Sequence, residues 1–276
     1  GEMALTTDAT GIQFRMLNRS KGPAVWGPRA QSDKKAYRLL MTEKIKSQKN
    51  LDLREGQATE LLVEGGKAVG VRTAQGEEFY AHHVIITTGT FMQGLIHIGD
   101  TNRPGGRRDE APSVGLSDSL RKFGFEVVRF KTGTPPRLDA KSIHWEILEP
   151  QLGDDPPEPF SFRTRSLKVE QLPCFLTYTN EKTHQIIRDN LHLSPLYAGR
   201  IVGIGPRYCP SVEDKVVKFA DKDRHQIYLE PEGRDTLEIY VNGLSMSLPT
   251  RVQEEIVHSI RGLEEAQFIR WAYAIE

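Results

Sequence analysis

Apolar positions at helical spacing mark the first predicted element of the chain. Between residues 33 and 49 they fall on roughly one helical face: Ala36, Leu39, Leu40 and Ile45. Ser32 stands directly before this run and is a favoured N-cap residue. The pattern therefore predicts a helix over 33–49, preceded by an ordered loop rich in Gly and Pro over 18–32.

The next forty residues carry strand patterns. The sequence predicts strands at 51–56 and on both sides of the Gly65–Gly66 turn, and a further strand after the turn at Gln75–Gly76. The run HVIITTGTF, residues 83–91, is short, β-branched and ends on glycine. Such a run is typical of a buried strand that brings its backbone to a ligand.

Residues 99–139 alternate between loops and short elements. We expect a Gly- and Pro-rich loop over 99–115, a helix from about Ser117 that stops at Gly124, and a strand over 125–132 that enters a rigid Pro-Pro turn. Beyond 140 the chain becomes proline-rich and acidic. We therefore place a domain boundary at 130, between a first domain over 1–130 and a second over 131–276.

The second half alternates strands and helices. Strands are predicted at 172–179, 226–233, 238–248 and 266–276. Helices are predicted after the cap residue Asn180, after Ser211, and over 250–261 before Gly262. This alternation predicts an α/β protein.

Composition limits the functional classes. Lys+Arg and Asp+Glu both number 37 in 276 residues, so the formal net charge is zero. If the protein binds nucleic acid, it must therefore use a local basic patch and not an overall positive charge. No apolar run approaches the ~20 residues of a membrane span, and the start lacks the order of a signal peptide. Two well-separated cysteines favour a reducing, cytoplasmic compartment.

The run IVGIGPRYCPSVEDK, residues 201–215, is the densest candidate site. Gly203 and Gly205 have the spacing of a dinucleotide-binding turn, but the third glycine position is Tyr208, so this fingerprint is weak. Ser211, followed by Asp214, matches a capping box and predicts a helix from Val212.

Cys209 comes just before that helix and two residues after Arg207, and both features favour a thiolate. A buried structural cysteine is the alternative. The polar, turn-forming neighbours favour a functional thiol at Cys209, whereas Cys174 lies in the apolar run LPCFLTY and is interpreted as core.

Basic loops offer candidate anion contacts. Lys131 and Arg137 flank a Gly-Thr-Pro-Pro turn, which suits a phosphate or carboxylate as well as it suits a rigid interdomain crossing with solvated charges. Arg103, Arg107 and Arg108 form a flexible basic loop that could grip a nucleic-acid backbone, although such loops are more often only solvated. The histidines have no ligand spacing, so we expect no metal site.

Several long blocks resemble the MnmG (GidA) family, the flavoprotein subunit that modifies the wobble uridine of tRNA. The blocks are GIQFRMLNRSKGPAVWGPRAQSD, TTGTFMQGLIHIG, KTGTPPRLDA, TNEKTHQIIRDNL, GPRYCPSVEDKVVKFADKDRHQIYLEPEG and NGLSMSLP. They occur in order from about residue 3 to the end of the chain.

The resemblance implies fold, cofactors and partners. It implies part of a glutathione-reductase-like, Rossmann-type FAD domain and an inserted mixed αβ domain that binds NADH. It implies a homodimer that works with the GTPase MnmE, using a folate one-carbon donor and glycine or ammonium, to add a carboxymethylaminomethyl group to tRNA.

The resemblance also implies site residues. Flavin contacts map to Thr59, where the family commonly has Val, and to Ser113. Cys209 corresponds to a cysteine proposed to act in the chemistry, for which we hypothesise addition of its thiolate to C6 of the uridine. The NAD segment corresponds to fifteen consecutive residues: Gly205, Pro206, Arg207, Tyr208, Cys209, Pro210, Ser211, Val212, Glu213, Asp214, Lys215, Val216, Val217, Lys218 and Phe219.

The chain departs from the family at both ends. The family's initial G-x-G-x-x-G and a second cysteine have no counterpart, and the family continues beyond residue 276 into a helical domain. We therefore expect a central fragment that is inactive alone. A non-enzymatic dimerisation or partner-docking module is the main alternative, and a stand-alone NAD oxidoreductase is a weaker one.

Overall fold

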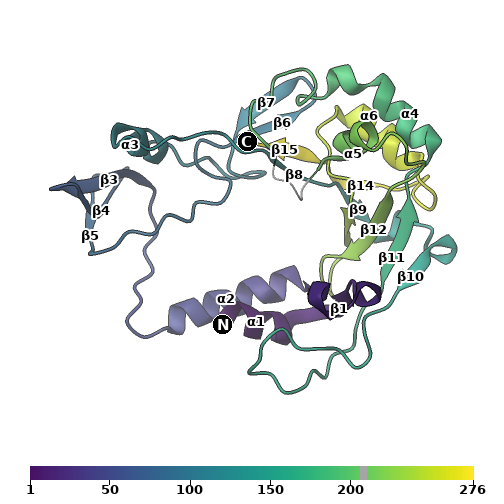
Figure 1. Cartoon of the computed structure of the whole chain (residues 1–276), viewed down its shortest axis with the longest axis horizontal. Helices are drawn as coiled ribbons and strands as arrows, with labels where there is room; N and C mark the ends of the chain where they lie inside the picture. Colours follow the sequence, from purple (N-terminus) through teal and green to yellow (C-terminus); the bar gives the residue numbers. More distant parts are fainter. Residues whose placement is uncertain (206–209) are drawn as a thin grey trace.

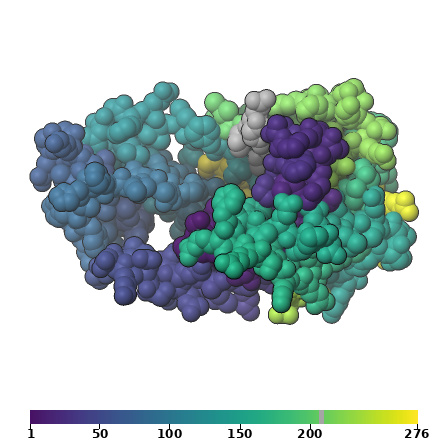
Figure 2. All heavy atoms as spheres, turned by 60° about the horizontal axis from the view of Figure 1, so that its bottom comes forward, coloured from purple at the N-terminus to yellow at the C-terminus, as the bar shows by residue number. Residues whose placement is uncertain are grey.

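The computed structural model describes residues 1–205 and 210–276. The chain forms an open arrangement in which four sheets are joined by long connections (Figure 1). In the space-filling view, the part of the chain from about residue 55 to 80 lies in a lobe that stands apart from most of the rest (Figure 2). Helices and sheets both occur, so the α/β class is confirmed at that level.

A six-stranded antiparallel sheet forms the centre of the larger part, in the order β10-β11-β12-β13-β9-β14. Its strands are β9 (Arg137–Asp139), β10 (Glu149–Gln151), β11 (Cys174–Tyr178), β12 (Gln226–Pro231), β13 (Glu238–Asn242) and β14 (Phe268–Arg270). Helices α4 (Glu181–Asp189), α5 (Val212–Lys218) and α6 (Thr250–His258) gather beside this sheet (Figure 1). The predicted helices of this half and the strands at 172–179, 226–233 and 238–248 are confirmed in type, with shorter bounds. The single strand predicted at 266–276 is wrong, because β14 and Tyr273–Ile275 (β15) are separate strands that pair in different sheets.

The main hydrophobic core lies between these helices and the sheet. Its fully buried side chains come from every layer: Leu138, Ile187, Val212, Ile227, Leu229, Val241, Val252 and Ile256. Helix α4 begins as the sequence predicts, because the Asn180 side chain accepts the N–H of Thr183 and the Thr183 hydroxyl accepts the N–H of Asn180. The apolar alternation of β12 and β13 and the apolar faces of α4 and α6 thus meet in one core.

The first fifty residues pack beside this sheet. They form α1 (Glu2–Thr10), the antiparallel pair β1 (Gly11–Leu17) and β2 (Gly27–Ser32), and α2 (Lys34–Ser47). Short 3-10 turns lie at Arg19–Lys21 and Pro23–Val25. The predicted cap at Ser32 is wrong by one position, because the Asp33 side chain accepts the N–H of Ala36. The apolar face of α2 is not buried in this chain, since Leu39 and Ile45 are exposed.

The separate lobe holds the three-stranded sheet β3 (Ala58–Glu64), β4 (Lys67–Thr73) and β5 (Glu78–Tyr80), with α3 (Leu116–Lys122) against it. The predicted turns at 65–66 and 75–76 are confirmed. The predicted strand at 51–56 is wrong, because these residues form no helix or strand. The predicted buried strand at 83–91 is also wrong: these residues form no strand, none of the described strands pairs with them, and Ile85 is 85% exposed.

A four-stranded antiparallel sheet connects the two parts. It has the order β7-β6-β15-β8, formed by β6 (Leu95–Ile98), β7 (Thr101–Pro104), β8 (Thr132–Thr134) and β15 (Tyr273–Ile275). The predicted strand at 125–132 is mostly irregular, with one parallel bridge between Phe130 and Ile204. Since β15 pairs with β6, strands from both sides of residue 130 share one sheet; the division into two domains stays a prediction.

Three 3-10 turns complete the second half, at Ala140–Ser142, Trp145–Ile147 and Leu191–Leu193. The named strand pairs are all antiparallel. Among the described residues, parallel pairing occurs only as isolated bridges. The Rossmann-type assignment of the first domain therefore rests on the family resemblance.

Candidate functional site

The segment 205–219 enters the core through α5. Residues 206–209, which include the predicted thiol Cys209, lie outside the described residues, so the prediction for Cys209 stays untested. From position 210 onwards the structure follows the sequence: the Ser211 side chain accepts the N–H of Asp214, and α5 begins at Val212. The predicted cap and helix start are confirmed.

An open groove of about 520 Å³ runs beside this segment. Its lining residues come from α5, from the 222–228 turn and strand, and from the end of β13: Pro210, Lys215, Phe219, Lys222, Arg224, His225, Gln226, Tyr228, Asn242 and Gly243. Nζ of Lys215 donates to the carbonyl oxygen of Gly243 at 3.0 Å. Position 243 has φ +100°, and a Cβ there would lie 2.7 Å from the oxygen of Gln226. Only glycine therefore fits at this position in the groove lining.

The groove is rich in cationic and aromatic side chains. Lys222 is 61% exposed and its nearest carboxylate, on the adjacent Asp221, lies 3.5 Å away. The guanidinium carbon of Arg224 lies 4.5 Å from the centre of the Tyr178 ring. Phe219 and Tyr228 add apolar rings to the lining. This combination suits an anionic ligand that also carries planar groups.

His225 forms part of the groove floor. Its backbone N–H donates to the Thr179 hydroxyl at 2.8 Å, and its Nε2 is buried without a hydrogen-bond partner in the described part of the chain. Burial, helped by the neighbouring His184 and Lys215, lowers the pKa of His225. This environment therefore favours the neutral ring.

Helix α5 itself carries a fully buried carboxyl group, that of Glu213. One of its oxygens, Oε1, accepts the backbone N–H of Ser247 at 3.0 Å, and the hydroxyls of Ser194 and Ser247 lie 3.5 Å away. The other oxygen has no hydrogen-bond partner among the described residues. Burial raises the pKa of Glu213, and the nearby charge of Lys131 offsets part of that rise.

The backbone N–H groups of Val202, Gly203 and Ile204 all donate to acceptors within the protein. The N–H groups of Val202 and Gly203 donate to Oε2 of Glu276 at 3.1 and 2.9 Å. Residues 202–204 lie parallel to 129–131, joined by hydrogen bonds of 2.9 Å from Lys131 N to Ile204 O and 3.1 Å from Ile204 N to Arg129 O. Residues 202–204 are therefore fixed by protein contacts on both sides.

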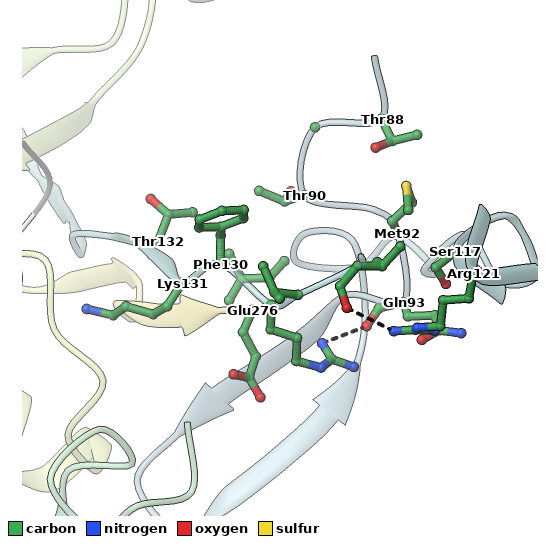
Figure 3. Close-up of a pocket in the computed structure, with 15 residues that line it drawn as sticks. Thr88, Thr90, Met92, Gln93, Ser117, Arg121, Phe130, Lys131, Thr132 and Glu276 are labelled. Atoms are coloured by element: carbon green, nitrogen blue, oxygen red, sulfur yellow. Dashed lines mark hydrogen bonds between the residues drawn. The ribbon is translucent and has the colours of Figure 1, made fainter. Parts of the chain in front are cut away.

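A second pocket, of about 350 Å³, lies on the other side of the 129–131 segment (Figure 3). The backbone of 88–90 and the side chains of Ser117, Arg121 and Arg129 contribute to its lining. The guanidinium of Arg129 donates to the carbonyl oxygen of Gln93 at 3.1 Å. The Ser117 hydroxyl is buried and has no hydrogen-bond partner in the described part of the chain. A polar ligand atom would satisfy that hydroxyl.

The two expected flavin contacts lie near this second pocket. Ser113 pairs with the segment that enters the pocket: the N–H of Gln93 donates to the oxygen of Ser113 at 2.8 Å. A Cβ built on Gly115 would lie 3.0 Å from the oxygen of Thr59. The structure thus brings Thr59 and Ser113, 54 positions apart in the sequence, to the same edge of the lobe.

The two cations of the Pro-Pro turn are held inside the protein. Lys131 is 4% exposed and extends away from the Arg121 side of the pocket (Figure 3). Arg137 forms an ion pair with Glu232 and donates to the Pro135 carbonyl at 2.7 Å. Both charges are therefore shielded, whereas the rigid-crossing alternative expected them to be solvated, and the expected anion contacts of Lys131 and Arg137 stay predictions.

The three loop arginines remain at the surface. Arg103 and Arg107 are 52% and 62% exposed, with carboxylates of Asp109 and Glu110 nearby. Arg108 is partly exposed, and its backbone N–H donates to the Tyr273 hydroxyl at 3.2 Å. Their guanidinium groups can reach an anionic partner without disturbing the core.

Cys174 is a core residue, as predicted. It is 1% exposed, and burial raises the pKa of its thiol to about 12. Residues 1–205 and 210–276 hold no group of three or more His, Cys, Asp or Glu side chains arranged for a metal ion. Over the same residues, no helix is both long and apolar enough to cross a membrane.

Several residues of these sites were missed from the sequence, among them Lys222, Arg224, Glu276 and Ser117. Lys222 and Arg224 follow the matched segment directly, and the alternating charges of ADKDRH could have indicated them. Glu276 and Ser117 carry no local signal, because each acquires its role from segments far away in the sequence.

A family profile, curated relatives and a solved structure all point to the same protein family. The profile of the family described as "Glucose inhibited division protein A" matches residues 1–276. The tRNA uridine 5-carboxymethylaminomethyl modification enzyme MnmG of Geobacter sulfurreducens is 59% identical over the whole chain, and that of Thermodesulfovibrio yellowstonii is 55% identical. The crystal structure of Aquifex aeolicus GidA (form I) superposes with a TM-score of 0.93 at 55% identity.

The chain covers less than half of each of these proteins. It spans 44% of either MnmG sequence and 47% of the crystallised GidA chain, while all of its own residues are covered.

Proposed function

This chain belongs to the GidA family, and we propose that it forms part of an FAD- and NADH-dependent enzyme that, as a homodimer working with the GTPase MnmE, adds a carboxymethylaminomethyl group to the wobble uridine of tRNA. Its similarity to MnmG enzymes over all 276 residues supports the reaction class. The groove beside α5 is the structural observation that carries the cofactor part of the proposal.

The α5 groove suits NADH by size and chemistry. Its volume of about 520 Å³ lies within the range of small-molecule sites. Lys222 and Arg224 supply charge for a pyrophosphate, and Phe219 and Tyr228 supply faces for the nicotinamide or adenine ring. Lys215 stiffens the groove through its bond to Gly243. The groove adjoins the NAD segment expected at 205–219.

The second pocket suits part of FAD. The partnerless Ser117 hydroxyl is a ready donor or acceptor, and the guanidinium groups of Arg121 and Arg129 offer positive charge. Thr59 and Ser113 lie at the edge where the resemblance expects flavin contacts. When bound, FAD would supply the hydride acceptor for NADH. The 129–131 segment lines the second pocket and is hydrogen-bonded to 202–204, which directly precede the NAD segment. This pairing would fix the position of the NAD segment relative to the second pocket.

The tRNA part of the proposal uses surface residues. Arg103, Arg107 and Arg108 would contact the phosphate backbone and orient the substrate. Cys209 remains the proposed nucleophile: its thiolate would add to C6 of the uridine, and the C5=C6 electron pair would move towards the C4 carbonyl, which makes C5 nucleophilic. Cys209→Ser in a full-length family protein that carries this sequence tests that role, and near-normal modification would remove it.

A direct measurement of NADH affinity tests the assignment of NADH to the groove beside α5. In the same full-length protein, we expect Lys222→Ala combined with Arg224→Ala to weaken NADH binding about tenfold or more, because charged hydrogen bonds are worth about 1.5–3 kcal/mol each. Lys182→Ala, an exposed position on α4 outside the groove, is the matched control and should bind normally. Equal NADH affinity in wild type, the double variant and Lys182→Ala would reject the groove as the NADH site. A colourless protein that binds neither NADH nor tRNA would favour the docking-module alternative.

A further inference from the structure

The loop that carries two cations of the α5 groove is held by hydrogen bonds at both ends. This loop, residues 222–225, leads from α5 towards β12. At its start, the N–H of Lys222 donates to the oxygen of Phe219 at 3.0 Å. At its end, the N–H of His225 donates to the Thr179 hydroxyl at 2.8 Å, and the N–H of Thr179 donates to the oxygen of His225 at 3.0 Å. The position of the loop therefore depends on a side chain at the end of another strand.

A side chain replaces the main chain at this point. The β11–β12 pairing ends at Tyr178 and Gln226. Thr179 and His225 are the next residues along the two strands, and facing residues of antiparallel strands can exchange two backbone hydrogen bonds. Here the second bond goes to the Thr179 hydroxyl, because the chain turns away at Asn180 to begin α4. The hydroxyl thus extends the ladder by one residue and fixes the end of the loop.

The same hydroxyl has a second partner. Nε2 of His184 lies 2.8 Å from the Thr179 oxygen. His184 is 2% exposed, and its ring packs against the His225 ring with the centroids 5.2 Å apart. Burial lowers the pKa of His184, which favours the neutral ring with one acceptor nitrogen. The hydroxyl can therefore donate its hydrogen to His184 while its oxygen accepts the N–H of His225.

His184 lies on a helix that is itself firmly packed. The Asn180 side chain that caps α4 also donates to the oxygen of Ser259 at 2.7 Å, at the end of α6. Ile187 of α4 is fully buried in the main core. Thr179 and His184 therefore connect the loop to the helices beside the sheet, although neither of them lines the groove.

We propose that Thr179 and His184 are positioning residues for the groove beside α5. Together they hold the 222–225 loop so that Lys222 and Arg224 face a bound dinucleotide. This inference rests on the proposed function, because it takes NADH as the occupant of the groove. Neither positioning residue touches the cofactor; both act through the loop that they hold.

The test compares two variants of Thr179 in a full-length family protein that carries this sequence. Thr179→Val keeps the shape of the side chain but removes the hydroxyl, whereas Thr179→Ser keeps the hydroxyl. We expect the dissociation constant for NADH, measured by fluorescence titration, to rise about tenfold in the Val variant, since small misplacements of binding groups carry costs of this order. The Ser variant should stay within about twofold of wild type, because its hydroxyl can make both hydrogen bonds.

Thr177→Val is the matched control for a general loss of stability. Thr177 lies two positions earlier on β11, is 3% exposed, and donates its hydroxyl hydrogen to the carbonyl oxygen of Arg261 at 2.9 Å. Its change to Val removes a buried hydrogen bond from the same strand but none from the 222–225 loop. Urea denaturation should show a loss of stability in both Val variants, whereas the dissociation constant for NADH in Thr177→Val should stay within about twofold of wild type.

Two further measurements address the hydrogen bonds themselves. Amide hydrogen exchange at His225 should quicken in Thr179→Val and stay slow in Thr179→Ser and Thr177→Val. His184→Phe keeps an aromatic ring against His225 but removes Nε2, and it should raise the dissociation constant for NADH about threefold.

The outcomes separate this inference from the proposed function. If the Lys222→Ala, Arg224→Ala double variant loses NADH affinity but a folded Thr179→Val protein binds NADH normally, the positioning role fails while the groove stands as the NADH site. Equal losses of affinity in Thr179→Val and Thr177→Val would also overturn the positioning role, and normal affinity in His184→Phe would overturn the part of His184. If wild type binds no NADH, the proposed function fails and the positioning role fails with it.

Discussion

Arg137 and Glu232, 95 positions apart in the chain, form an ion pair in which both side chains are largely shielded from solvent. Arg137 lies on β9, and Glu232 follows β12, so the pair connects two strands of the six-stranded sheet across β13. The guanidinium also lies 4.3 Å from the centre of the Tyr240 ring, and Lys34 of α2 donates to Glu232 at 2.8 Å. The pair thus joins the sheet to the N-terminal segment.

Removing one partner of this pair should destabilise the fold. We expect Arg137→Ala to lower the free energy of unfolding by about 3 kcal/mol, because it leaves the buried Glu232 carboxylate with only the solvent-exposed Lys34 as its ion-pair partner. Urea denaturation measures the change. Arg270→Ala is the control, since Arg270 pairs with Glu238 in the same sheet but is 48% exposed; its cost should stay below about 1 kcal/mol. Equal costs for the two variants would contradict this assignment.

The exposed loop arginines should behave differently from Arg137. Neutralising Arg107 and Arg108 together should weaken tRNA binding and reduce the slope of log K against log salt by about 1 for each phosphate that the loop no longer neutralises. The experiment is a salt titration of tRNA affinity in a full-length protein that carries this sequence. Thermal stability should change little, because both side chains reach solvent. An unaltered salt slope would remove the loop from the proposed interface.

Glu213 should make stability depend on pH. Burial raises its pKa in the folded state above the ordinary value of 4.5. The stability linked to its proton is therefore fully present below about 4.5 and is lost as the pH rises through the folded pKa. Glu213→Gln carries no such proton, so the difference in unfolding free energy should move in favour of the variant between pH 4.5 and 8. A difference in unfolding free energy that stays flat over this pH range for Glu213→Gln would contradict the prediction.

The two cysteines should differ in reactivity. Cys174 is buried, with its thiol pKa raised to about 12, so it should not react with a thiol reagent at pH 8 in the native protein. We expect one labelled thiol per native chain, two after denaturation, and none in native Cys209→Ser. Mass spectrometry of the labelled protein gives the count. Labelling of Cys174 in the native state would show that this part of the core opens readily.

Local sequence signals predicted the local structure well. The caps at Asn180 and Ser211 and the turn at Gly65–Gly66 were correct, because each depends on residues within three or four positions of one another. The segment 83–91 shows the opposite case. Its β-branched composition favours a strand, yet a strand forms only where a partner offers hydrogen bonds, and within the described residues none pairs with it.

For the candidate sites, too, contiguous residues determined some features and tertiary packing determined the others. The sequence by itself determined the family and the core placement of Cys174, since these follow from contiguous residues. Only the tertiary structure decided that Arg137 is held by Glu232, that Glu276 occupies the amides of Val202 and Gly203, and that Lys222 and Arg224 line an open groove. Those contacts join residues brought together by the packing of sheets and helices, and no local preference in the sequence specifies which distant charge will balance which.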